Sequence, residues 1–196
     1  LGTNDTGKYF VLNKNANATY MPWNGHILTK ESQALRGKLQ VNFSFTMDSS
    51  TSPSKTSASF RVMCADDFTS VAALTDAKYT MFRVQPFNSG GQVVYGIQKS
   101  ASDNDAIASY QQINKGVWYD VQLTFDLVND KVKMVARQRG ASGTIEFERS
   151  TGLYNNGTPF ESIKSIAIQA TDGMVIGIDG FEVKYLQEGP QVNASS

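Results

Sequence analysis

The sequence predicts an all-β protein built as a two-sheet antiparallel β-sandwich of about eleven strands, with at most one short helix. Apolar and polar residues alternate with a period of two in run after run, which is typical of strands with one face in a core and the other in water. No run with the helical period is long enough for a core helix. The 196 residues suffice to bury a core without disulfides or a metal.

The first half of the chain contains five predicted strands. In Leu39–Met47 the odd positions are apolar and the even positions are polar, so the two sets face opposite sides of a sheet. The run at 59–64 repeats the pattern and turns Phe60, Val62 and Cys64 inward. The other predicted strands of this half are 8–12, 79–85 and 92–98.

The second half begins with a predicted hairpin over 117–137. Its two strands turn apolar residues inward at every second position, and Asn129-Asp130 between them is a pair that tolerates a tight turn. Four further strands are predicted at 144–148, 165–169, 175–178 and 181–185.

Gly180 is predicted to form a β-bulge. The apolar positions are even before it, at Ile176 and Ile178, and odd after it, at Phe181 and Val183. One extra residue restores the alternation, and glycine tolerates the backbone angles that a bulge requires.

Three segments fall outside the predicted strands. Residues 66–77 are a candidate short helix or turn, and the Ser/Thr-rich stretch 48–59 is expected to be a mobile loop. Residues 187–196 read as a tail or linker. We therefore expect residues 1–196 to form a single domain whose ordered core spans approximately 5–186.

Composition excludes several classes of function. Eighteen basic and eighteen acidic residues cancel, so no net positive charge favours nucleic acid. No apolar run approaches the roughly 20 residues of a membrane span, so membrane insertion is not expected. One cysteine and one histidine exclude an internal disulfide, a zinc cluster of several cysteines and any mechanism that needs two histidines.

Two runs resemble a known fold family. GVWYDVQLTFDLVNDKVKMVA resembles the tryptophan-led hairpin of concanavalin A-like, laminin-G-like jelly-roll domains, and VIGIDGFEVKYL is similar to the closing strand of such domains in carbohydrate-active proteins. Together they cover about a fifth of the chain. The resemblance implies a jelly-roll sandwich and a role in sugar binding, with polysaccharide lyases and glucanases as enzymatic relatives.

The polar strand faces carry the first candidate ligand-binding surface, made by Arg61, Tyr79, Arg83, Gln85 and Gln98. Where their strands share a sheet with others, Gln40, Asn42, Asp120 and Gln122 would extend the same array. Amides and guanidinium groups match the vicinal hydroxyls of sugars, and a flat ring covers the apolar face of a sugar. The alternative is an ordinary solvated sheet face, which also favours these residue types.

The loop TYMPWNGH is a second candidate. Tyr20, Trp23 and His26 lie within seven residues of one another, and an aromatic residue on a loop is a natural stacking platform. Trp23 could equally plug the end of the sandwich. Trp118, which begins a predicted core strand, is interpreted as structural.

A structural calcium ion is the third candidate. Calcium requires hard oxygen ligands, and the resemblance suggests Asp179 as one ligand, with Asp5 or Asn4 near the N-terminus placed to face it. The alternative role of Asp179 is a hydrogen bond to the backbone at the Gly180 bulge.

Catalysis finds less support. The chain lacks the G-x-S-x-G motif of serine hydrolases, and Cys64 is predicted to face inward. Glu146 and Glu148 are interpreted as solvent-exposed residues of an edge strand and not as a catalytic pair. A lyase would need a neutralising side chain and a base, which Gln85, Gln98, the two arginines, Tyr79 and His26 can supply. The "Q-[IV]-H" strand expected in such lyases is replaced here by FRVQ and YGIQ.

The sequence therefore predicts a non-catalytic carbohydrate-binding module of a secreted or cell-surface protein, tethered to further domains, with a polysaccharide or oligosaccharide as its partner. A small polysaccharide lyase of the same fold is the first alternative. An adhesin or spacer domain is the second.

Overall fold

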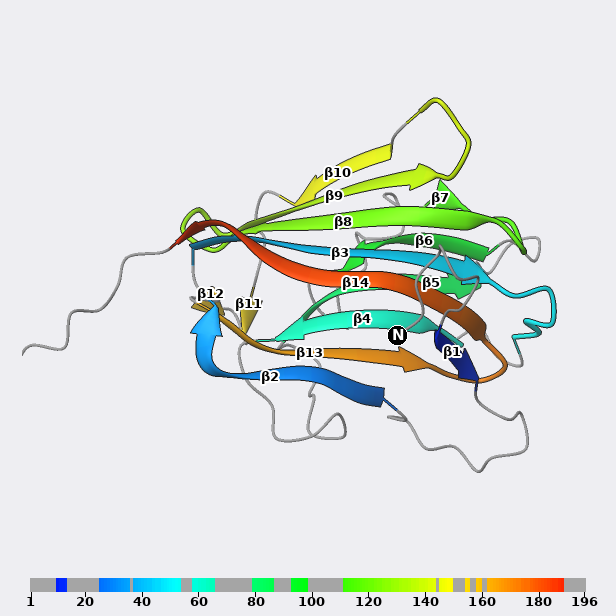
Figure 1. Cartoon of the computed structure of the whole chain (residues 1–196), viewed down its shortest axis with the longest axis horizontal. Helices are drawn as coiled ribbons and strands as arrows, with labels where there is room; N and C mark the ends of the chain where they lie inside the picture. Colours follow the sequence, from blue (N-terminus) through cyan, green and yellow to red (C-terminus); the bar gives the residue numbers. More distant parts are fainter. Residues whose placement is uncertain are drawn as a thin grey trace, which may run out of the picture.

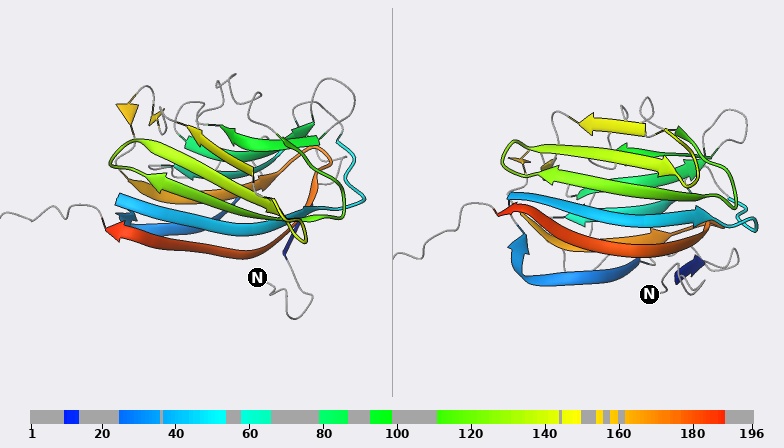
Figure 2. Two further views of the ribbon diagram at one scale, coloured as in Figure 1. Left: turned by 90° about the horizontal axis from the view of Figure 1, so that it is seen from above. Right: turned by 45° about the horizontal axis from the view of Figure 1, so that its top comes forward.

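The protein is a sandwich of two antiparallel sheets that pack face to face (Figures 1 and 2). The computed structural model describes residues 10–13, 25–35, 37–53, 58–65, 79–86, 93–98, 111–143, 145–149, 154–155, 158–159 and 162–188. These residues form fourteen strands and no helix, and therefore no helix that could cross a membrane.

Sheet A has the strand order β1-β14-β3-β8-β9-β10. In chain order its strands are β1 (Phe10–Asn13), β3 (Gly37–Met47), β8 (Trp118–Asp126), β9 (Lys131–Gln138), β10 (Ile145–Arg149) and β14 (Val175–Glu188).

Sheet B has the order β2-β13-β4-β5-β6-β7. Its strands are β2 (Gly25–Leu35), β4 (Phe60–Ala65), β5 (Tyr79–Pro86), β6 (Val93–Gln98), β7 (Gln111–Gln112) and β13 (Ile163–Ala170). A separate small ribbon pairs β11 (Tyr154–Asn155) with β12 (Thr158–Pro159).

The core lies between the two sheets. It contains the apolar residues that the sequence alternation predicted to face inward. Phe45 of sheet A packs at 5.3 Å from Phe82 and at 5.8 Å from Phe60, both of sheet B, measured between ring centroids. The ring of Tyr119 stacks on Phe45 at 5.4 Å. Tilted and edge-to-face aromatic pairs add to the burial of apolar area that holds the sheets together.

The predicted hairpin and bulge are both confirmed. Asp130 in the β8–β9 turn has φ 52°, and the Asn129 amide N–H donates to Asp126 Oδ1 at 3.0 Å. At the bulge, Gly180 has φ +60° and the β14–β3 register shifts between Asp179 and Glu182. The two predicted strands on either side of Gly180 are thus one continuous strand, β14.

Four other expectations need correction or fall outside the described residues. β2 was not predicted because its KESQ run breaks the alternation and its pairing with β13 contains two register shifts. The loop at 48–59 is anchored where it begins, since the Thr51 hydroxyl donates to the Val175 carbonyl at 2.9 Å. β14 continues to Glu188, two residues into the predicted tail. The segment 66–77 lies outside the described residues.

Candidate functional site

The predicted polar array is divided between two opposite surfaces. Arg61, Arg83 and Gln85 belong to sheet B, whereas Gln40, Asn42, Asp120 and Gln122 belong to sheet A. We call the outward surface of sheet A face A and that of sheet B face B. The single broad array is therefore wrong, because strand pairing joins β3 to β8 and β4 to β5 but never one group to the other.

Face B brings the predicted arginines together. Arg61 of β4 is paired directly with Arg83 of β5 on one side and with Gln169 of β13 on the other. The next row along the strands is Met63, Met81 and Gln98, and Tyr79 follows, opposite Ala65. Five predicted residues, Arg61, Tyr79, Arg83, Gln85 and Gln98, thus occupy outward register positions of neighbouring strands.

Much of face B is not open to solvent. Met63 and Gln169 are both 0% exposed, although their neighbours along each strand point into the core. Arg61, Arg83 and Gln85 are half-buried. Face B is therefore not an ordinary solvated sheet face around Met63 and Gln169, contrary to that alternative.

Of the aromatic loop, Gly25 and His26 are described, and they begin β2 at the edge of sheet B. Gly25 pairs with Gln169 at the end of this row, and His26 pairs with the adjacent Ile168. Tyr20 and Trp23 lie outside the described residues. Their ligand-binding role stays a prediction.

Trp118 begins β8, as predicted, but its side chain lies outside the core. It precedes Tyr119, which points inward, so the tryptophan projects from face A and is only half-buried. The Arg139 guanidinium lies 5.2 Å from the centre of its ring. A cation–π contact of this kind at a partly exposed site contributes about 0.5–1 kcal/mol.

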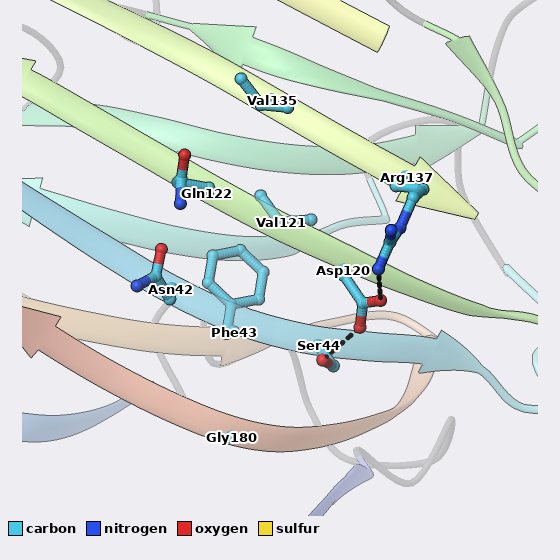
Figure 3. A pocket seen from close by; sticks show the side chains of 9 residues that line it. All are labelled: Asn42, Phe43, Ser44, Asp120, Val121, Gln122, Val135, Arg137 and Gly180. Carbon is cyan, nitrogen blue, oxygen red and sulfur yellow. Dashed lines mark hydrogen bonds and ion pairs between the residues drawn. The ribbon is translucent and has the colours of Figure 1, made fainter. Parts of the chain in front are cut away.

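Face A contains a shallow hollow of about 340 Å³ (Figure 3). Three adjacent strands supply its polar lining: β3 with Asn42 and Ser44, β8 with Asp120 and Gln122, and β9 with Arg137. Val135 and Gly180 also line the hollow, as do Phe43 and Val121, which alternate with the polar residues along β3 and β8.

Asp120 organises the floor of this hollow. Its Oδ1 accepts hydrogen bonds from the Ser44 hydroxyl at 2.7 Å and from Arg139 Nη2 at 2.8 Å. Its Oδ2 lies 3.6 Å from Arg137 Nη2. Burial acts to raise the pKa of Asp120, but the hydrogen bonds from Arg139 and Ser44 and the charges of both arginines outweigh it and bring that pKa below its usual value.

Asp179 is buried beside the bulge, where its Oδ1 accepts a hydrogen bond from the Gly180 amide N–H at 2.8 Å. Among the described residues, no three His, Cys, Asp or Glu side chains are grouped so that they could hold a metal. Asp5 lies outside the described residues. Calcium binding at Asp179 therefore stays a prediction, since calcium requires six to eight oxygen ligands.

Cys64 is buried in the core, and desolvation raises the pKa of its thiol to about 12. A thiolate is the reactive form of cysteine, so Cys64 is unsuited to nucleophilic chemistry.

No family model matches the chain, and no curated protein matches its sequence. Solved structures do match. Lectin II from Ulex europaeus superposes with a TM-score of 0.55 at 10% identity, covering 79% of this chain and 79% of that chain. The basic winged bean lectin with Tn-antigen gives 0.50 at 12% identity, covering 82% and 76%. The catalytic domain of a glycoside hydrolase family 131 protein from Coprinopsis cinerea gives 0.46 at 13% identity, covering 81% and 59%.

These likenesses establish the architecture. The chain has the concanavalin A-like jelly-roll fold, as the two runs in its sequence indicated. At such low identity they establish the fold alone.

Proposed function

We propose that the chain is a non-catalytic carbohydrate-binding domain of a secreted or cell-surface protein, tethered to further domains, and that it binds a polysaccharide or oligosaccharide on face B. The observation that carries the proposal is the cross-strand row of Arg61 and Arg83, with Gln85 two residues further along β5.

The chemistry of this row suits a sugar. A guanidinium group donates in a planar fork that matches two vicinal hydroxyls or one carboxylate, and the Gln85 amide both donates and accepts. Because Arg61 and Arg83 are half-buried, much of their side-chain freedom is already lost, so a ligand orders them at low entropic cost. Tyr79 lies in the same strand as Arg83, at a position that also faces outward. The fold shared with two lectins, one of them with Tn-antigen, supports the same function.

Binding to a panel of neutral and acidic polysaccharides by affinity electrophoresis tests the proposal. We expect Arg83→Gln to weaken retention by the recognised polysaccharide about tenfold, because the charged fork is lost. Lys184→Gln, a matched loss of charge at an exposed position of sheet A, should leave retention unchanged. Equal retention of the wild type and Arg83→Gln would overturn the assignment to face B.

The same protein separates binding from catalysis. Tyr79 and the two arginines share a face, and a lyase needs a base and a neutraliser for the uronate carboxylate. Incubation with uronate-containing polysaccharides should produce no ultraviolet absorbance from unsaturated products. Its appearance, and its loss in Arg83→Gln, would show that the domain is a lyase.

A further inference from the structure

We propose that the hollow on face A is a second binding site, separate from face B, and that it takes a neutral sugar or a similar vicinal polyol. The site goes beyond the proposed function, because none of its lining residues belongs to sheet B.

The floor of the hollow is preorganised. Ser44 and Asp120 are paired across β3 and β8, and their direct hydrogen bond is reinforced by Arg139, whose Nη2 also donates to Ser44 Oγ at 3.1 Å. Asp120 is therefore fixed through Oδ1 from two sides. A polar group that is held in place before binding costs less to order when a ligand arrives.

Two acceptors at the hollow still lack a hydrogen-bond donor. Asp120 Oδ2 is 3.6 Å from Arg137, which is too long for a hydrogen bond. Asn42 Oδ1 is buried and accepts no hydrogen bond, while its Nδ2 donates to Gln40 at 3.2 Å and to Glu182 at 3.4 Å. The Asp120 side chain is 32% exposed, so a ligand hydroxyl can donate to its Oδ2, whereas Asn42 Oδ1 is buried and accepts from a ligand only after its side chain moves.

These acceptors select the class of ligand. A carboxylate, sulfate or fully ionised phosphate has no proton to donate, and an ammonium group would meet Arg137 beside the same carboxylate. A neutral polyol donates through its hydroxyls and accepts from Arg137 and from the Gln122 amide, both of which line the hollow. Val135 offers apolar contact for the C–H face of a sugar ring.

The size of the hollow agrees with a small ligand. Its volume of about 340 Å³ is at the lower end of the roughly 300–1,000 Å³ range of small-molecule sites. The hollow is open at Gly180, where a β-carbon would meet no atom within 4 Å. Figure 3 shows Asn42 and Gln122 on neighbouring strands along one side and Arg137 at the far end.

Amide chemical shifts in ¹H–¹⁵N NMR spectra test the site during titration with methyl glycosides of glucose, galactose, mannose and N-acetylglucosamine, with glucuronate as the anionic probe. We expect at least one neutral glycoside to shift amides of β3, β8 and β9, and glucuronate to leave them unchanged. Val135→Trp, which fills the hollow and leaves the Ser44–Asp120–Arg139 contacts in place, should raise Kd about tenfold or more. Asp120→Asn should weaken binding similarly.

Face B provides the control. Arg83→Gln should leave the shifts of β3, β8 and β9 unaltered, so the site on face A stands even where polysaccharide binding on face B fails. Neutral glycosides that shift only β4 and β5 would overturn the proposal, as would an unchanged spectrum in millimolar glycoside or wild-type affinity in Val135→Trp.

Discussion

Faces A and B arise from the same alternation of residues but have different environments. On face A the outward side chains of β8, namely Asp120, Gln122 and Thr124, are all half-exposed. On face B the outward Met63 and Gln169 are as buried as the core. A period of two thus identifies the residues that leave the core but does not tell whether they meet water or protein.

The difference matters for how each face can bind. The charges of face A are satisfied mainly by one another, through Asp120 and two arginines, around a hollow that stays open. The arginines of face B are half-buried next to fully buried neighbours. Face B therefore resembles a desolvated interface, where single side chains carry large effects, and face A resembles a small polar site.

The largest expected effect tests the burial of face B. Met63→Ala should lower the free energy of unfolding by about 2–5 kcal/mol, as for a core methionine, because the side chain is fully buried. Val135→Ala, an apolar truncation at a half-buried position of face A, should cost below about 1 kcal/mol. Urea unfolding measures both.

Met63→Leu controls for shape, and a volume-conserving exchange should cost less than about 1.5 kcal/mol. If Met63→Ala proved as mild as Val135→Ala, the outward side of β4 would be solvated and the contrast between the faces would disappear.

Local features of the fold could be predicted because they depend on neighbours in sequence. The alternation in Leu39–Met47, the turn at Asn129-Asp130 and the bulge at Gly180 each need only a few adjacent residues. β2 was not predicted, because polar residues interrupt the apolar alternation in its sequence and its pairing with β13 contains register shifts.

The candidate sites depended on pairing that the sequence does not show. Ser44 and Asp120 are 76 positions apart, and only the β3–β8 register brings them into contact. The position of Trp118, by contrast, follows from local alternation, because Tyr119 points inward and the preceding residue therefore points outward.

Trp118→Ala should have the second-largest effect. It removes a half-buried ring and its cation–π contact with Arg139, so we expect a loss of about 1–2 kcal/mol in unfolding free energy. Arg139→Ala in the same background should then cost less than it does alone, because the two side chains share one contact. A loss of about 3–5 kcal/mol for Trp118→Ala, as for a core aromatic residue, would instead place the ring inside the sandwich.

Acid should weaken face A selectively. The pKa of Asp120 is lowered in the folded protein, so its contribution to stability is present above the unfolded value near 3.9 and is lost as pH falls through the folded value. The gap in unfolding free energy between the wild type and Asp120→Asn should thus narrow below about pH 4. Solvent screening keeps this gap to about 1 kcal/mol or less at higher pH. A gap that widened on acidification would show that Asp120 is destabilising in the fold.

The smallest effect is expected from removing metal. Asp179 already accepts a hydrogen bond from the Gly180 amide, and the described residues group no further acidic side chains with it. A ligand that binds only the folded state raises Tm, so removing a bound ion would lower it. We therefore expect the same Tm, within about 1 °C, in excess chelator and in millimolar calcium. A fall in Tm that calcium reverses and that Asp179→Asn abolishes would show instead that Asp179 binds calcium, with its other ligands supplied from outside the described residues.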